Sequence, residues 1–272
     1  MTLEVKNIDI NDILFSGSCF RAHLENDGSI TNIIEDRVVN IKQEGDILYF
    51  DSNNTDGLDK LIINYFDLDR DYDLINKELI RNNSDLKNMI NMCRNYRIIN
   101  QNSFEMCISY IISQNNNVKR ISNSIEKLCK KYGDKVIFKN KEYYLFPKYE
   151  QIKDLTVDDF KELGVGFRDK YLKDFLDKYK SLRNINTLNT TDALKELMKV
   201  KGIGLKVASC ILLFGYKRLD VFPIDTWVKQ YISNNYNIKN DIKSIERFAK
   251  DNFGEYSGLV IQYMFHSERN KK

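Results

Sequence analysis

Apolar and polar residues alternate over residues 39–43, and an apolar run over 47–50 follows after a turn centred on Gly45. This pattern predicts two antiparallel strands joined by a tight turn. A further candidate strand runs through His23. From Gly57 onward, apolar residues return every three or four positions, which predicts a helix. The N-terminal third of the chain is therefore predicted to be an antiparallel sheet accompanied by helices.

The periodicity then becomes helical for the rest of the chain. Apolar stripes over 104–112, 118–132 and 171–179 each follow the spacing of one helix face. We therefore expect an α+β protein with two domains. Residues 1–95 are expected to form an N-terminal antiparallel sheet domain with helices, and residues 96–272 an all-α domain.

One stretch of the helical region has a distinctive glycine pattern. Gly202 and Gly204 bracket a single apolar residue between two helical segments, which predicts a helix-hairpin-helix turn over 197–210. Glycine permits positive φ and the close approach of another backbone. The start of the second helix also exposes free amides, which can bind an anion. A tight turn without any ligand is the ordinary alternative.

Two ionisable residues accompany this turn. Lys206 lies in the first turn of the second helix, and Asp225 comes shortly after Pro223. A lysine near a helix start is usually solvated, and an aspartate after a proline is usually an N-cap. A salt bridge between the two is a third alternative. The ordered combination of glycine turn, lysine and aspartate is nevertheless more specific than any one of its parts.

Composition limits the possible functions without selecting one. The 272 residues are 42% hydrophobic, enough for a sizeable core, and the net charge of +3 permits nucleic-acid binding without requiring it. The chain has no apolar run of about 18 residues and no signal-peptide pattern at its start, so we expect no membrane association. Five dispersed cysteines indicate a reducing, cytoplasmic environment, with nucleoid association if the source is bacterial.

The glycine turn and the aspartate resemble the motifs of a known family. Val-Lys-Gly-Ile-Gly-Leu-Lys-Val-Ala, residues 200–208, is similar to the helix-hairpin-helix signature of the HhH-GPD DNA base-excision glycosylases. Phe-Pro-Ile-Asp, residues 222–225, is similar to the segment that holds their catalytic aspartate. More narrowly, the chain resembles the 8-oxoguanine DNA glycosylases with lyase activity. The resemblance implies that Lys206 is the nucleophile and Asp225 the catalytic carboxylate.

The resemblance also implies a pocket for the damaged base. Gly17 matches the glycine whose carbonyl accepts the N7 hydrogen that 8-oxoguanine has and guanine lacks. Cys210 and Phe265 match the two residues that sandwich the base. Ordinary core packing on helix faces is the alternative for both of these side chains.

Two positions of this pocket depart from the family pattern. Ile261, with Gln262 next to it, stands where a glutamine often reads the Watson–Crick edge of the base. Trp227 stands where some members have histidine. The base-edge contacts are therefore the least defined part of the implied pocket.

Other matched residues contact DNA around the lesion in the family. Asn115, Arg120 and Arg168 match residues that fill the gap left by the flipped base and contact the opposite cytosine. Phe167 matches an aromatic side chain that intercalates into the stack. A solvated, charged loop is the alternative for this set. The backbone amides implied to hold phosphate are those of Gly202, Gly204 and Val207.

The resemblance implies no cofactor. Many members of the wider superfamily carry a four-cysteine iron–sulfur cluster after the catalytic aspartate. No cysteine follows Cys210 in this chain, which excludes that cluster and agrees with the 8-oxoguanine branch. The cysteines also form no pairwise metal motif. We expect double-stranded DNA containing 8-oxoguanine as the partner and a monomer as the active form.

These observations together predict a bifunctional DNA glycosylase and AP lyase. A lysine amine would attack C1′ of a flipped-out nucleotide, form a Schiff base and permit β-elimination. Asp225 would supply a fixed negative charge beside the oxocarbenium-like sugar. One alternative is a non-catalytic helix-hairpin-helix DNA-binding protein, which would need neither Lys206 nor Asp225. Another is a glycosylase for a different damaged base, whose monofunctional members generally lack the lysine.

Overall fold

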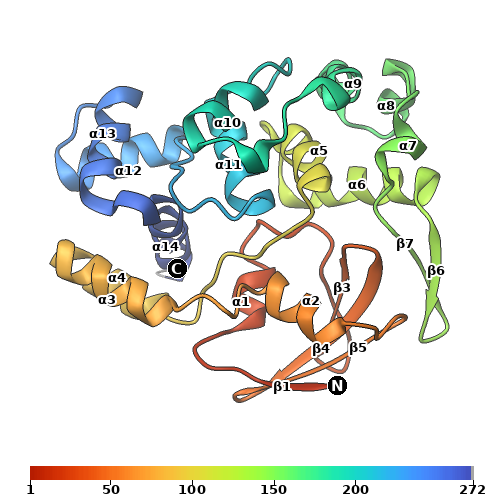
Figure 1. Ribbon diagram of the computed structural model, residues 1–272, viewed down its shortest axis with the longest axis horizontal. Helices are drawn as coiled ribbons and strands as arrows, with labels where there is room; N and C mark the ends of the chain where they lie inside the picture. Colours follow the sequence, from red (N-terminus) through yellow and green to blue (C-terminus); the bar gives the residue numbers. More distant parts are fainter. Residues whose placement is uncertain (271–272) are drawn as a thin grey trace.

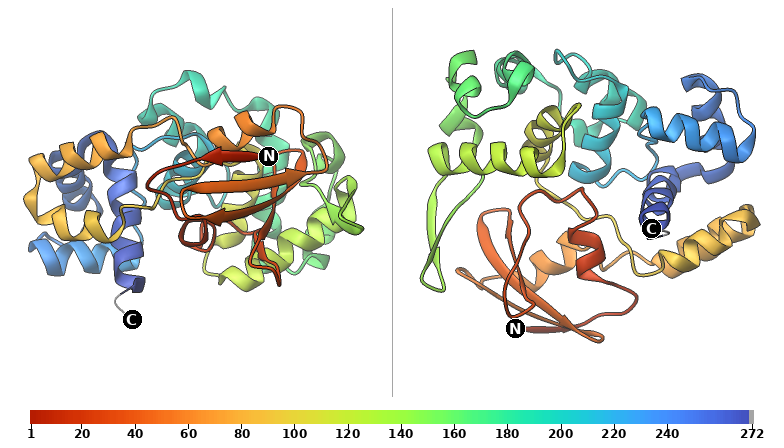
Figure 2. Two further views of the ribbon diagram at one scale, coloured as in Figure 1. Left: turned by 90° about the horizontal axis from the view of Figure 1, so that it is seen from below. Right: turned by 180° about the vertical axis from the view of Figure 1, so that it is seen from behind.

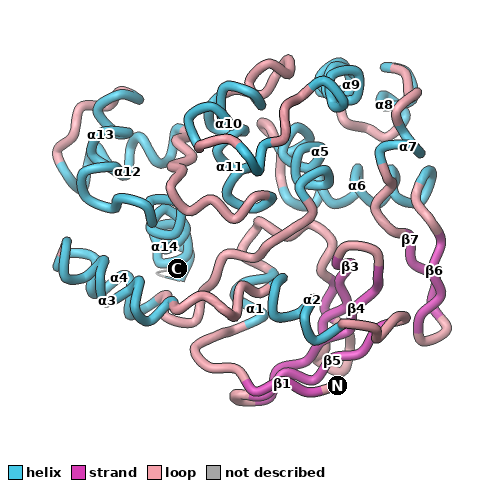
Figure 3. The backbone as a smooth tube through the Cα atoms, in the orientation of Figure 1, coloured by secondary structure: helices cyan, strands magenta, loops and turns pink. Residues whose placement is uncertain are grey.

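The N-terminal part of the computed structural model is a five-stranded antiparallel sheet (Figures 1 and 3). The structure describes residues 1–270. The strands lie in the order β1-β5-β4-β3-β2, so the four strands β2 to β5 form a meander and β1 pairs with β5 at one edge. Their bounds are β1 (Thr2–Glu4), β2 (His23–Leu24), β3 (Ile30–Ile34), β4 (Arg37–Glu44) and β5 (Ile47–Ser52).

The pair β4–β5 follows the alternation predicted from the sequence. Exposed and buried residues alternate along the whole of β5, and Ile41 of β4 lies opposite Phe50 of β5. Gly45 joins the two strands with a φ of 58°, in the left-handed region that glycine adopts readily. Helices α1 (Ile10–Leu14) and α2 (Leu58–Tyr65) lie beside the sheet (Figure 1). Their buried apolar residues belong to the same core as those of the strands.

Helices dominate the remainder of the described chain, which confirms the α+β class. Residues 104–112 of α5 and 207–214 of α11 are all buried, and these two helices pack against each other at the centre of the helical part. None of the described helices has the length and apolar character needed to cross a membrane.

The helices that follow the N-terminal sheet are α3 (Tyr72–Asn82), α4 (Lys87–Met92), α5 (Ser103–Ser113), α6 (Val118–Tyr132), α7 (Tyr149–Ile152), α8 (Val157–Glu162), α9 (Asp169–Lys178), α10 (Thr190–Leu197), α11 (Leu205–Gly215), α12 (Thr226–Tyr236), α13 (Ile242–Phe253) and α14 (Ser257–Asn270). Short 3₁₀ turns are η1 (Ser84–Leu86), η2 (Gly166–Arg168), η3 (Tyr179–Ser181), η4 (Ile185–Thr187) and η5 (Gly254–Tyr256).

A two-stranded hairpin interrupts the helical part, where the sequence predicted helices alone. β6 (Lys135–Phe138) pairs with β7 (Lys141–Tyr144) in antiparallel register. Lys139 and Asn140 between them both have positive φ, the turn geometry that matches the twist of a hairpin. Lys139 Nζ donates to Asn40 Oδ1 of the N-terminal sheet at 2.7 Å. This tertiary contact supports the strand conformation, and the β-branched and aromatic residues of β6 and β7 were the available sequence signal.

Elements from the two ends of the chain meet in space. Helices α3 and α4, which precede the expected boundary at residue 95, pack against α13 and α14 (Figures 1 and 2). Arg21 also joins the two parts, since its Nε donates to Glu126 Oε1 of α6 at 2.9 Å and its Nη2 donates to the carbonyl of Tyr144. The last two helices of the chain therefore pack against helices that come before residue 95.

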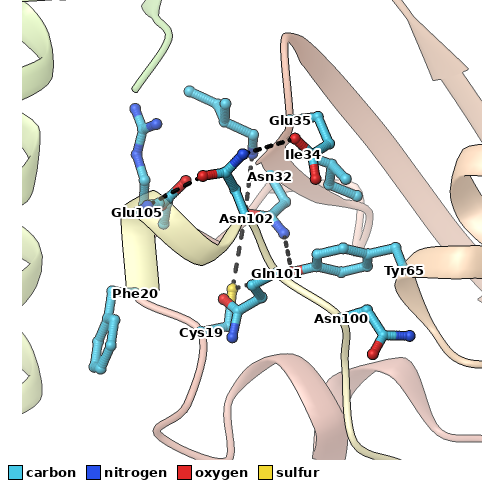
Figure 4. A pocket seen from close by; sticks show the side chains of 12 residues that line it. Cys19, Phe20, Asn32, Ile34, Glu35, Tyr65, Asn100, Gln101, Asn102 and Glu105 are labelled. Carbon is cyan, nitrogen blue, oxygen red and sulfur yellow. Dashed lines mark hydrogen bonds between the residues drawn. The ribbon is translucent and has the colours of Figure 1, made fainter. Parts of the chain in front are cut away.

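A small pocket at this junction contains a buried carboxyl group. Glu105 in the first turn of α5 is 9% exposed, and Asn102 caps that turn by accepting its N–H (Figure 4). Asn102 Nδ2 also donates to Glu35 Oε2 of the N-terminal part at 3.0 Å. Burial raises the pKa of Glu105 to about 7, although the charge of Arg21 opposes that rise. The junction therefore holds a group whose charge changes near neutral pH.

Candidate active site

The predicted hairpin forms between α10 and α11. Gly202 has a φ of 84°, and a Cβ on it would lie 2.3 Å from Cδ2 of Tyr171, so no other residue fits there. Gly204 is the N-cap residue of α11 with no side-chain cap, and the space around its Cα is open. The first-turn amides of α11, including that of Val207, therefore lack an N-cap side-chain acceptor. An open helix start of this kind suits a bound phosphate.

Lys206 and Asp225 both lie near the buried thiol of Cys210. Burial raises the pKa of the Cys210 thiol, the charge of Lys206 opposes that rise, and the charge of Asp225 adds to it. Both charges thus act on the pKa of the same thiol. Within the part of the chain that the structure describes, the Lys206 ammonium and the Asp225 carboxylate do not approach to the 4.0 Å of an ion pair. Asp225 Oδ1 instead accepts the N–H of Val228 at 2.9 Å and caps α12.

An aromatic stack borders this group of residues. The Trp227 ring stacks on Phe265 of α14 with 4.4 Å between ring centroids, and Tyr231 stacks on Trp227 at 4.9 Å. Ile261, one helical turn before Phe265, is fully buried in the core, whereas Gln262 is partly exposed. Of the two residues considered for base-edge reading, Gln262 is therefore the one with a side chain accessible to a ligand.

The loop that contains Gly17 is held by the C-terminal helix. Gly17 has a φ of 103° and lies next to Val118 at the start of α6. Arg269 Nη1 donates to the carbonyl of Phe15 at 3.1 Å and to that of Ser16 at 2.6 Å. These two carbonyls immediately precede Gly17. Helix α14 therefore positions both the Phe265 ring and the Gly17 backbone.

The four residues expected around the lesion lie in two adjoining loops. Asn115 is exposed with a φ of 47°, and Arg120 is exposed in the first turn of α6. Phe167 is 55% exposed in η2, but Arg168 beside it is only 4% exposed. Arg168 donates to the carbonyls of Gln114 and Val165 at 2.8 Å and of Asn115 at 2.9 Å. In this conformation Arg168 holds the Asn115 loop and does not present its guanidinium to solvent.

Two family matches cover most of the chain. Residues 1–107 match the N-terminal domain of 8-oxoguanine DNA glycosylase. Residues 108–253 match the HhH-GPD superfamily of base excision DNA repair proteins, which is more than half of the 272 residues. The chain belongs to the HhH-GPD superfamily. The motif resemblance seen in the hairpin and after Pro223 therefore reflects membership of that superfamily.

Solved structures of HhH-GPD proteins resemble this chain along nearly its whole length. The apo form of Clostridium acetobutylicum 8-oxoguanine glycosylase/lyase is 36% identical, with a TM-score of 0.90, and the match covers 98% of each chain. The same enzyme in complex with double-stranded DNA containing cytosine opposite 8-oxoguanine also has 36% identity and a TM-score of 0.90. That match covers 100% of this chain and 98% of the other.

Curated relatives are similar over a shorter span. The N-glycosylase/DNA lyase of Saccharomyces cerevisiae is 30% identical over 230 residues, which is 75% of this chain and 60% of the yeast protein. The probable N-glycosylase/DNA lyase of Methanothermobacter thermautotrophicus is 28% identical over 189 residues, 61% of each chain. The chain thus spans about 60% of the length of these two relatives.

Sequence reasoning did not identify two residues that organise this HhH-GPD site. Tyr171 packs on the hairpin glycine, and Arg269 holds the backbone before Gly17. Tyr171 follows Phe167 by four residues, a spacing that places two side chains on one helix face and was a usable signal. Arg269 had no such signal, because its partner lies 253 residues away in sequence.

Proposed function

We propose that this HhH-GPD protein is a bifunctional DNA glycosylase and AP lyase that removes 8-oxoguanine from duplex DNA. The observation that carries the proposal is that Lys206 and Asp225 both lie near Cys210 without an ion pair between them. An ion pair with the aspartate would hold a lysine in its protonated form, which is not nucleophilic, and would occupy the carboxylate as well. The similarity to the 8-oxoguanine glycosylase/lyase of Clostridium acetobutylicum supports the same conclusion.

The proposed reaction uses Lys206 as an amine nucleophile. Its Nζ lone pair bonds to C1′ while the C1′–N9 bond breaks, and the bonding electrons leave with the base, which takes up a proton. Opening of the sugar ring converts the C1′ adduct to a Schiff base. Loss of a proton from C2′ then expels the 3′ phosphate by β-elimination and cuts the strand. Asp225 would stabilise the positive charge that develops on the sugar before the new bond is complete.

The pocket for the base is proposed to lie between Cys210 and Phe265. Trp227 stacks on one face of the Phe265 ring, and a flipped base would stack on the opposite face. The Gly17 carbonyl would accept the N7 hydrogen of 8-oxoguanine, and Gln262 is the candidate for its Watson–Crick edge. The amides of Gly202, Gly204 and Val207 would hold phosphate.

The opposite strand is proposed to meet the loops of α6 and η2. Phe167 would enter the stack, and Arg120 would contact the orphaned cytosine, with Asn115 in the gap. Arg168 would join them only after releasing one or more of its three backbone carbonyls. One chain supplies every residue of this arrangement, so we propose that the protein acts on DNA as a monomer.

Covalent trapping tests the central assignment. Borohydride should reduce the Schiff base and leave a protein–DNA adduct on an 8-oxoguanine duplex. Lys206→Gln should abolish the adduct while retaining duplex binding. Lys201→Gln is the matched control, because it removes a charge from the same hairpin away from the helix start. Normal trapping by Lys206→Gln would show that another residue is the nucleophile.

The substrate range separates the proposal from its alternatives. Duplexes carrying 8-oxoguanine, an alkylated purine or no lesion should be cleaved only in the first case. Binding to all three duplexes without cleavage would favour a non-catalytic DNA-binding protein. Cleavage of the alkylated duplex alone would assign the chain to a different lesion.

A further inference from the structure

Helix α9 lies between the hairpin and the loops proposed to meet the lesion. The ring of Tyr171 rests on Gly202, because a Cβ built on that glycine would fall within 2.3–2.7 Å of three of its ring atoms. No side chain separates the ring from the hairpin backbone. A movement of Gly202 toward α9 is therefore blocked by this ring.

The same face of α9 makes two further contacts with the hairpin. Asp174 Oδ2 accepts the backbone N–H of Lys201 at 2.7 Å. Lys178 Nζ donates to the carbonyl of Lys199 at 2.9 Å and to Asp174 Oδ2 at 2.8 Å. Residues three and four positions apart share a helix face, so Tyr171, Asp174 and Lys178 form one contact surface. The hairpin is thereby fixed to α9 at three successive points.

The N-terminal end of α9 leads directly into the exposed aromatic residue. Tyr171 meets Phe167 edge to face, with 6.0 Å between ring centroids and an interplanar angle of 80°. The Arg168 guanidinium lies 4.4 Å from the centroid of the same Phe167 ring. Phe167 is 55% exposed, so these two contacts are the main restraints on the orientation of its ring.

We propose that Tyr171 is a positioning residue that couples the hairpin to the Phe167 ring. The proposal rests on the proposed function, because it assumes that the hairpin holds phosphate and that Phe167 enters the base stack. Tyr171 touches both elements at once, and the remaining contacts of α9 keep the distance between them fixed. Binding of phosphate at the hairpin therefore places the Phe167 ring at a set distance along the duplex. Flipping of the base is then driven by the same event that anchors the backbone.

The size of the effect follows from the edge-to-face contact. Such a ring pair is commonly worth a factor of about 2 to 10 in an equilibrium. Tyr171→Leu keeps an apolar side chain against Gly202 but removes the ring edge. It should slow excision from an 8-oxoguanine duplex by that factor, whereas Tyr171→Phe should retain the wild-type rate because the hydroxyl makes no part of the contact. Tyr179→Leu is the matched control, since the Tyr179 ring packs on Phe104 and Phe175 in the core.

A double-mutant cycle with Phe167→Ala distinguishes coupling from a general loss of structure. The measurements are single-turnover excision and the fluorescence rise of 2-aminopurine placed beside the lesion, which reports base displacement. We expect Tyr171→Leu to slow both signals in the wild type and to have no further effect in Phe167→Ala. Should Tyr171→Leu not fold, Tyr171→Met serves in the same cycle.

Two results would overturn the coupling. One is a Tyr171→Leu defect of equal size in the Phe167→Ala background, and the other is a Tyr171→Phe defect as large as that of Tyr171→Leu. Failure of the proposed function has a different signature, because the wild type would then leave 8-oxoguanine in place. In that case the 2-aminopurine cycle on a duplex with an abasic-site analogue still tests the coupling by binding alone.

Discussion

Replacing Asp225 by asparagine should remove one negative charge and little else. The carboxylate caps α12 by accepting the N–H of Val228 at 2.9 Å. Asparagine caps a helix about as well as aspartate, whereas alanine lacks the acceptor and costs about 0.5–2 kcal/mol. We therefore expect Asp225→Asn to keep the Tm of the wild type and Asp225→Ala to lower it.

The effect on catalysis should exceed the effect on the helix. The Asp225 charge helps to raise the pKa of the Cys210 thiol, so its field reaches the pocket proposed for the sugar and base. Removing one preorganised electrostatic group typically lowers the rate about 10²- to 10³-fold, which is about 2.7–4 kcal/mol. Both variants should lose excision to a similar extent, although only Asp225→Ala loses the cap.

Single-turnover excision with enzyme in excess isolates the chemical step for each variant. Strand cleavage of an 8-oxoguanine duplex reports the product, and thermal unfolding of the same preparations reports stability. A near-normal rate for Asp225→Asn, with a slow rate and a lowered Tm for Asp225→Ala, would refute the electrostatic role. Asp225 would then be a helix cap alone.

Three further predictions concern charge. Burial raises the pKa of Glu105 to about 7, above the ordinary value near 4.3, so the folded state binds a proton more tightly than the unfolded state does. The free energy of unfolding of the wild type, relative to that of Glu105→Gln, should therefore fall by up to about 3 kcal/mol between pH 4 and pH 8. Denaturant titrations at each pH measure this difference. Hydrogen bonds from Lys199 and from the Arg183 N–H lower the pKa of Glu196 to about 2, so its stabilising effect is complete above about pH 4.5. The Tm advantage over Glu196→Gln should disappear as the pH falls toward 2. Arg120→Met should reduce a preference for excision opposite cytosine over adenine, each contact being worth about 1–3 kcal/mol; equal wild-type rates opposite all four bases would contradict that assignment.

The local features of the chain could be predicted because short-range rules govern them. The alternation over 39–43 became β4, and the Gly202 turn with Lys206 after it became the start of α11. Each depends on residues within a few positions of one another. The β-hairpin formed by β6 and β7 was missed although its β-branched and aromatic residues are a local strand signal, because its two strands of four residues are too short to interrupt the helical periodicity around them.

The candidate site likewise combines residues that could be predicted from the sequence with contacts that only the structure shows. Motif matching selected Lys206, Asp225 and Cys210 as residues of one site, but the absence of an ion pair between the first two depends on how α11 and α12 pack. The sequence also suggested Arg168 as a DNA contact. Only the structure shows that its guanidinium is occupied by the carbonyls of Val165, Gln114 and Asn115.

The sequence by itself determined the α+β class and the helix-hairpin-helix turn, because periodicity and glycine conformation depend on neighbouring positions. The candidate catalytic residues followed from the resemblance of two short motifs to those of a known family, which needed no packing information either. The tertiary structure alone decided that Arg269 holds the backbone before Gly17 and that Tyr171 joins Gly202 to Phe167. These contacts connect segments that are distant along the chain, and their geometry exists only once the helices have packed.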